Sequence, residues 1–252
     1  MKNIIKAKNV TNPFTDLFSS GDIVTKNTLK KIVLYISEET LKDISKRLIS
    51  PSEIKRMRKT YKYFLIRYKK IEKNKQNKKA LLIKINKEKY RELFEGALLK
   101  AKESYEEKKL PLIGYLIANS LFTNTPITNN IQSLIYAEQL SYRQLCIIAV
   151  IGQNEWQGFH KLTDKPLYKQ DRKNLFDEEI EGIYSDLNHL LALGIIGQEL
   201  SPGAGPTIPS GMFFIAPALL KLQYAGRLLH NGMMLDSINK KDIIKIVQLL
   251  RK

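Results

Sequence analysis

The chain has 252 residues, 43% of them hydrophobic and 27% charged, which is enough to bury one large core or two small ones. A single cysteine excludes an internal disulfide, and the longest nearly unbroken apolar stretch, residues 111–122, is shorter than the roughly 20 residues that span a membrane. The first residues lack the apolar run and cleavage site of a signal peptide, so we expect a cytoplasmic protein.

The net charge of +17 is concentrated in one segment of the chain. Residues 55–91 hold 16 of the 42 Lys and Arg but only 2 of the 25 Asp and Glu, so this segment carries +14 and the rest of the chain +3. Such a concentrated field attracts polyanions, above all nucleic acid, and an anionic membrane surface is a less favoured alternative. The other alternative is that these lysines only solvate the surface.

Two helices are predicted in the N-terminal part. The first lies near residues 38–49, and the second begins at "SPSE", where Ser50 is the N-cap, Pro51 the first helical residue and Glu53 completes a capping box. Apolar residues then recur at alternating spacings of three and four, which predicts a core-facing or partner-facing stripe along a long helix, made of Ile54, Met57, Tyr61, Phe64, Tyr68 and Ile71.

Basic residues occupy the other faces of this helix. We predict that they contact phosphates without reading sequence, with a tyrosine available for stacking, and the candidate set is Lys55, Arg56, Arg58, Lys59, Lys62, Tyr63, Arg67, Lys69 and Lys70. Other residues are candidates for a protein interface or a homo-oligomer contact, namely Tyr61, Phe64, Tyr68, Ile208 and Met212.

The middle of the chain predicts a helical hairpin. Residues 72–79 have no apolar side chain and are expected to form a basic hinge, and residues 80–86 are compatible with a strand or a helix. From Lys87 an apolar face runs through Phe94 to Tyr105, and a second, apolar helix follows Pro111. The predicted domains are therefore an N-terminal helical region (1–86), this hairpin (87–125) and a C-terminal module (126–252).

The C-terminal module has the element order of a winged helix. Two helices, the second capped by Ser141, precede an acidic helix at 177–193 that ends at Gly194, where a left-handed C-cap is expected. Two strand-like segments, "IIGQEL" and "GMFFIAP", enclose a Pro-rich loop, and a last helix, "ALLKLQYAGRLLH", follows. The predicted fold class is thus mainly α, a helical bundle with a C-terminal winged-helix-like module containing one short β-hairpin.

The predicted reading elements of this module lack the cations that DNA binding needs. The helix at 177–193 carries five acidic residues and no Lys or Arg, and residues 194–217 contain no basic residue. A winged helix that reads DNA needs donors and cations on both elements. We therefore favour a protein-docking or packing role for the wing over a transcriptional regulator, which stays an alternative.

The segments "YRELFEGALLKAKESYEEKKLPLIGYLIANSLF" and "LIYAEQLSYRQLCIIAVIG" resemble bacterial abortive-infection alpha and related defence-associated proteins. The resemblance covers about residues 87–230 and rests on the spacing of leucine and alanine. It implies a role in defence against phage and leaves the chemistry open. The basic segment 55–91 departs from the pattern of that family.

No pattern in the chain predicts an enzyme or a cofactor. The three histidines are not at metal-ligand spacing, Cys146 stands in an apolar run, and there is no phosphate-binding glycine loop. Trp156, Phe159 and His160 are compatible with a small pocket, although aromatic packing explains them better. We expect a non-enzymatic binding protein that contacts the backbone of nucleic acid and acts as an accessory or sensor in anti-phage defence. The alternative is a scaffold or oligomerising subunit that uses the aromatic stripe and the wing for protein-protein contacts.

Overall fold

A computed structural model shows a mainly helical chain with one small antiparallel sheet. The chain divides into two compact units, residues 1–134 and 135–252, with the boundary inside helix α6 (Ile127–Gln139). The structure describes residues 37–44, 50–73, 87–123, 125–157, 161–163, 178–199 and 215–251.

The long helix of the first unit begins where the sequence predicts. Residues 37–44 are helical, in agreement with the described part of the first predicted helix. Helix α3 (Pro51–Lys73) then starts with a capping box, because the Ser50 amide donates to Glu53 Oε2 at 2.6 Å and the Glu53 amide donates to Ser50 Oγ at 3.4 Å. These hydrogen bonds lower the pKa of Glu53. Two amides at the helix start, which lack partners within the helix, are thereby satisfied.

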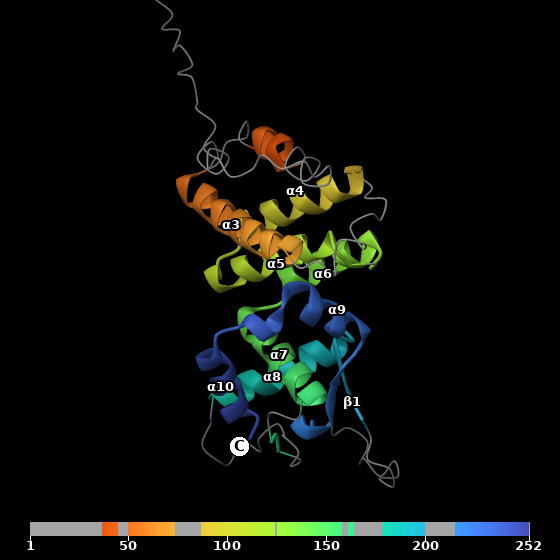
Figure 1. Ribbon diagram of the computed structural model, residues 1–252. Helices are drawn as coiled ribbons and strands as arrows, with labels where there is room; N and C mark the ends of the chain where they lie inside the picture. The colour runs from red at the N-terminus through yellow and green to blue at the C-terminus, as the bar shows by residue number, and fades with distance from the viewer. Residues whose placement is uncertain are drawn as a thin grey trace, which may run out of the picture. The chain divides into compact units, whose positions relative to one another are not determined.

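The predicted hairpin forms as helices α4 (Lys87–Glu103) and α5 (Leu110–Ser120), which are joined through the short helix η3 (Glu107–Lys109). The core of the first unit lies between this hairpin and α3 (Figure 1). The apolar stripe of α3 faces this core. Phe94 of α4 packs edge-on against Tyr61 and Phe64, with ring centroids 6.0 and 5.4 Å apart. The buried stripe residues of α3 are Met57, Tyr61, Phe64, Tyr68 and Ile71.

Helices α3 and α5 approach each other most closely at Gly114. A Cβ atom at this position would lie 2.6 Å from the carbonyl oxygen of Thr60 and 2.9 Å from the amide nitrogen of Phe64. Only a residue without a side chain therefore fits here, and this explains the glycine in an otherwise apolar helix.

One residue of the predicted hairpin face lies outside the core. Tyr105 is 96% exposed, because α4 ends at Glu103 and the chain leaves the helix before Tyr105 can join the buried face. The rest of that face is buried as predicted, and it comprises Tyr90, Leu93, Phe94, Ala97, Leu98 and Ala101.

Helix α7 (Tyr142–Gln157) is the centre of the second unit. Its residues from Leu145 to Ile151 are all buried, and they include Cys146, which is 2% exposed. Helices α8 (Glu178–Ala192), α9 (Tyr224–Met233) and α10 (Lys240–Leu249) all pack against it (Figure 1).

Helix α8 ends at Ala192, and Gly194 follows as the left-handed C-terminal cap that the sequence predicts. Gly194 has a φ of +64°, its amide donates to the Leu191 carbonyl, and the Ile195 amide donates to the Leu190 carbonyl, both at 3.0 Å. This is the hydrogen-bond pattern of a Schellman motif, in which Leu190 and Ile195 also bury their side chains. The chain then turns directly into the sheet.

The sheet differs from the predicted hairpin in its second strand. Strand β1 (Ile196–Gln198) pairs antiparallel with β2 (Leu220–Leu222), with Ile196 opposite Leu222. The sequence predicts the second strand at 211–217 and a helix from 218. Residues 211–214 lie outside the described part of the chain. Pro217–Leu219 form a 3-10 turn, η4, and the strand follows this turn. Leu220 and Leu222 are buried on either side of the half-exposed Lys221, and this alternation is typical of a strand.

Two helices, α9 and α10, follow β2, and only the first of them is among the predicted elements. The omitted helix is α10, which follows the short η5 (Leu235–Ser237); the Asn239 side chain caps it by accepting from the Lys241 amide at 2.9 Å. Among the described residues, no helix is both long enough and apolar enough to cross a bilayer.

Candidate nucleic-acid interface

Five lysines of α3 form one row on the surface of the helix. They follow each other at spacings of three or four residues, with Ile66 filling the one vacant position, so they share one side of the helix. At 1.5 Å per residue the row is about 27 Å long. Ile66 is 48% exposed, and the side chains of the row are exposed apart from the half-exposed Lys59. We call this row the lysine ridge, and its members are Lys55, Lys59, Lys62, Lys69 and Lys73.

Two arginines of the predicted set, Arg56 and Arg67, bond to other helices of the first unit. Arg56 donates its Nε to the Lys102 carbonyl at 2.7 Å, and Arg67 donates its Nε to Asn119 Oδ1 at 2.8 Å. Arg58 is half-buried. The guanidinium groups of Arg56 and Arg67 therefore help to fix α3 against its neighbours in addition to adding positive charge.

An acidic residue lies at the N-terminal end of the ridge. Glu107 accepts a hydrogen bond from Lys59 Nζ at 2.9 Å, and this bond, together with the Lys59 charge, lowers the pKa of Glu107. Lys55 and Arg56 lower it further. The positive field of the ridge is therefore partly neutralised near Lys59.

Two tyrosines lie beside the ridge. Tyr63 of α3 and Tyr115 of α5 form an edge-to-face pair, with ring centroids 5.9 Å apart and ring planes at 88°. Burial raises the pKa of Tyr115, Tyr63 adds to this rise, and Arg67 opposes it. The pair and the Arg67 guanidinium thus form one half-exposed cluster between α3 and α5.

Three candidates for a protein interface are buried in this structure, namely Tyr61, Phe64 and Tyr68. They are 0, 0 and 3% exposed because α4 and α5 cover the stripe. They therefore offer no surface to a partner, and the core-facing alternative holds for them. The other two interface candidates, Ile208 and Met212, lie outside the described residues.

Lys70 is the remaining member of the predicted basic set, and it is exposed on the side of Tyr63, seven residues further along α3. The candidate set omitted Lys73, Ile66 and Tyr115. The three-four spacing places Lys73 and Ile66 on the ridge and could have found both. Tyr115 comes beside Tyr63 only through the packing of α5 on α3, for which one sequence carries no direct signal.

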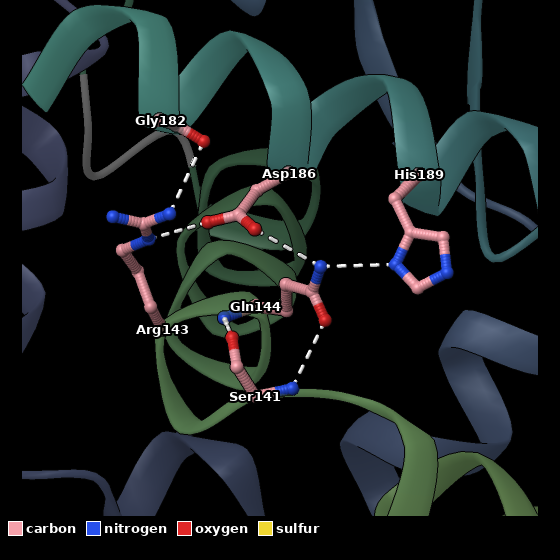
Figure 2. A network of polar contacts seen from close by, with 6 residues as sticks. All are labelled: Ser141, Arg143, Gln144, Gly182, Asp186 and His189. Carbon is pink, nitrogen blue, oxygen red and sulfur yellow. Dashed lines mark hydrogen bonds and ion pairs between the residues drawn. The ribbon is translucent and has the colours of Figure 1, made fainter. Parts of the chain in front are cut away.

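The second unit contains a polar network between α7 and α8 (Figure 2). Gln144 is at its centre: its Oε1 accepts from the Ser141 amide at 2.9 Å, and its Nε2 donates to Asp186 Oδ1 and to His189 Nδ1, both at 3.0 Å. Ser141 Oγ in turn accepts from the Gln144 amide at 3.1 Å, which completes the cap predicted for this helix.

Arg143 extends this network on the other side of Asp186. Its Nε donates to Asp186 Oδ2 and its guanidinium also donates to the Gly182 carbonyl at 3.2 Å (Figure 2). Asp186 is only 8% exposed, so both of its oxygens need such partners. The network therefore holds α8 onto the start of α7, a structural task that accounts for its polar groups.

Among the described residues, no group of three or more His, Cys, Asp or Glu side chains is placed to hold a metal ion. A comparison with models of protein families, with curated proteins and with solved structures finds no match for this chain.

Proposed function

We propose that this protein binds the sugar-phosphate backbone of nucleic acid through the lysine ridge of α3, without reading sequence. The observation that carries the proposal is the geometry of the ridge: five lysines lie in a row about 27 Å long on one side of α3, and this length corresponds to about eight phosphate spacings of about 3.4 Å along one strand. The helix is fixed from behind by its buried aromatic stripe. A rigid row of cations lowers the entropy lost when a polyanion binds.

The charge of the remaining chain supports this choice of surface. Outside residues 55–91 the net charge is only +3, so long-range attraction of a polyanion concentrates on α3 and its neighbourhood. In our proposal the protein is a non-enzymatic, cytoplasmic accessory or sensor. The resemblance to abortive-infection alpha proteins supports a role in anti-phage defence.

The second unit provides the protein-docking part of the proposal. We propose that α8 and the β1–β2 hairpin form a winged-helix-like module that contacts a partner protein or a second copy. Glu178 is exposed in the first turn of α8, Glu179 pairs there with Lys245 Nζ at 2.8 Å, and the helix itself has no Lys or Arg with which to contact phosphates. This acidity favours docking over the alternative of a winged-helix regulator.

The test of the ridge compares two triple variants of the full chain. K55Q/K62Q/K69Q removes three exposed ridge lysines, and K161Q/K240Q/K241Q removes three exposed lysines of the second unit with the same change in net charge. Fluorescence anisotropy with labelled DNA and RNA at about 50 and 200 mM salt measures affinity and its salt dependence.

If the ridge contacts phosphates, the unmodified protein loses about a hundredfold in affinity between the two salt concentrations. The ridge variant binds at least about tenfold more weakly at low salt and has a shallower salt dependence, whereas the control variant stays within about twofold of the unmodified protein. Equal losses in the two variants, or no binding at low salt, would contradict the proposal.

Cross-linking separates the two surfaces. Ultraviolet cross-linking of the full chain to RNA or DNA, read by mass spectrometry, should place the nucleic acid on α3. Cross-links on α8 or on residues 200–214 would support the regulator instead.

A further inference from the structure

We infer that the tyrosine pair Tyr63–Tyr115 stacks with unpaired bases, so that the ligand of the ridge is single-stranded nucleic acid. This inference rests on the proposed function, since it requires a strand held by the ridge. It adds the class of nucleic acid, which phosphate contacts alone do not determine.

The position of Tyr63 on α3 is the first part of the argument. Tyr63 lies four residues after Lys59, three before Ile66 and four before Arg67, so on the helix surface it borders the ridge directly. Lys70 follows seven residues later on the same side and is exposed. A strand whose phosphates follow the ridge therefore has its bases within reach of the Tyr63 ring.

The contact with Tyr115 is the second part. The two rings are perpendicular, with centroids 5.9 Å apart, an arrangement that aromatic pairs favour and that restricts the rotation of both rings. Both side chains are half-exposed. Rings that are already ordered lose little entropy when a base stacks on them, and this strengthens binding.

Arg67 adds a cation to the same cluster. Its Nε is held by Asn119 Oδ1 at 2.8 Å, which fixes the guanidinium next to Tyr115. Aromatic rings with a neighbouring arginine and a positively charged groove are the combination found in sequence-tolerant proteins that bind single strands. Duplex bases are stacked on each other and cannot stack on protein rings, so the pair contributes nothing to duplex binding.

The test uses two strands that differ only in their bases. The full chain is titrated with an oligothymidylate of about 16 nucleotides and with an abasic strand of the same length and backbone, at about 50 and 200 mM salt. A duplex of equal length is the third probe. We expect the oligothymidylate to bind about tenfold more tightly than the abasic strand, with the same salt dependence for both.

Variants of the tyrosines assign this difference to the pair. Y63F/Y115F keeps both rings and should keep the preference, whereas Y63L/Y115L keeps apolar bulk without rings and should bind the oligothymidylate and the abasic strand equally. Circular dichroism checks that each variant is folded, and Y115L alone replaces the double variant if the latter is unfolded.

The outcomes separate this inference from the proposed function. Salt-dependent binding with equal affinity for all three probes would overturn the stacking role and leave the ridge proposal intact. A preference for oligothymidylate that persists in the leucine variant would also overturn it. Absence of salt-dependent binding to every probe would refute the proposed function and this inference together.

Discussion

Gly114 of α5 lies against Thr60 of α3 so closely that a Cβ atom on the glycine would come within 2.6 Å of the Thr60 carbonyl oxygen. This contact sets the distance between the helix that carries the ridge and the helix that carries Tyr115. Because the nearest atoms belong to the α3 backbone, a larger residue can be accommodated only if one helix moves.

We therefore expect Gly114→Ala to lower the free energy of unfolding of the first unit by about 1–3 kcal/mol. The matched control is Gly96→Ala in α4, where the new Cβ would meet only Leu134 Cδ2 at an ordinary distance of 3.5 Å. This control should be neutral or stabilising by up to about 1 kcal/mol, because alanine favours a helix more than glycine does. Denaturant unfolding measures both, and equal effects would contradict the close approach.

Replacement of Gln144 tests the polar network of the second unit. Gln144→Ala removes the bonds to the Ser141 amide, Asp186 and His189 together and leaves buried polar atoms without these partners. We expect a loss of about 2 kcal/mol in the free energy of unfolding. Gln153→Ala, on the same helix, removes the exposed bond to Asp236 and should cost less than about 0.5 kcal/mol. A Gln144 variant as stable as the Gln153 variant would show that the network contributes little.

Acidification should destabilise the second unit through His230. His230 is 1% exposed; burial lowers its pKa, and Asp236, whose Oδ1 lies 3.4 Å from Nε2, opposes this shift. In the unfolded chain the pKa of a histidine is about 6.5, which is higher than the pKa of His230 in the folded chain. Just below about pH 6.5 the unfolded chain therefore binds more protons at this residue than the folded chain does. The contribution of His230 to stability is therefore fully present above about pH 6.5 and is lost as the pH falls toward the lower folded pKa.

Unfolding curves at about pH 7.5, 6.5 and 5.5 check this prediction. His230→Phe keeps a ring in the same place without a titrating group, so its stability should fall less between the first and last pH. Parallel pH dependence in the two proteins would rule out His230 as the source.

Neutralisation of Glu107 should strengthen nucleic-acid binding. Glu107→Gln removes the negative charge that pairs with Lys59 and also faces Lys55 and Arg56. We expect affinity to rise about two- to fivefold at low salt, with a smaller gain at high salt because ions screen the charge. Glu199→Gln, which breaks the Lys221 pair in the second unit with the same change in net charge, is the control. Equal gains in both variants would assign the effect to net charge alone.

Local signals in the sequence predict much of the helical fold. The capping boxes at Ser50 and Ser141 involve side chains three residues apart, and the αL glycine at 194 ends α8, so each can be read from a short window. The stripe of α3 is predicted equally well, because its periodicity extends over several turns.

The remaining features depend on contacts that no short window contains. Residues 220–222 form a strand because β1 pairs with them, although the leucines there also fit the start of a helix. Helix α10 is an exception, because its Asn cap and its apolar residues Ile243, Ile246 and Val247 lie within one short window that predicts a helix. The candidate site is similar: its lysines follow from spacing, whereas Tyr115 reaches Tyr63 only because two helices cross at a glycine.

The bonds of Gln144 have a further consequence for local opening of the second unit. The same amide side chain that closes the first turn of α7 also holds Asp186 on α8, so fraying of that turn releases the neighbouring helix as well. A change in conditions that speeds hydrogen exchange at the Ser141 amide should therefore also speed exchange along α8.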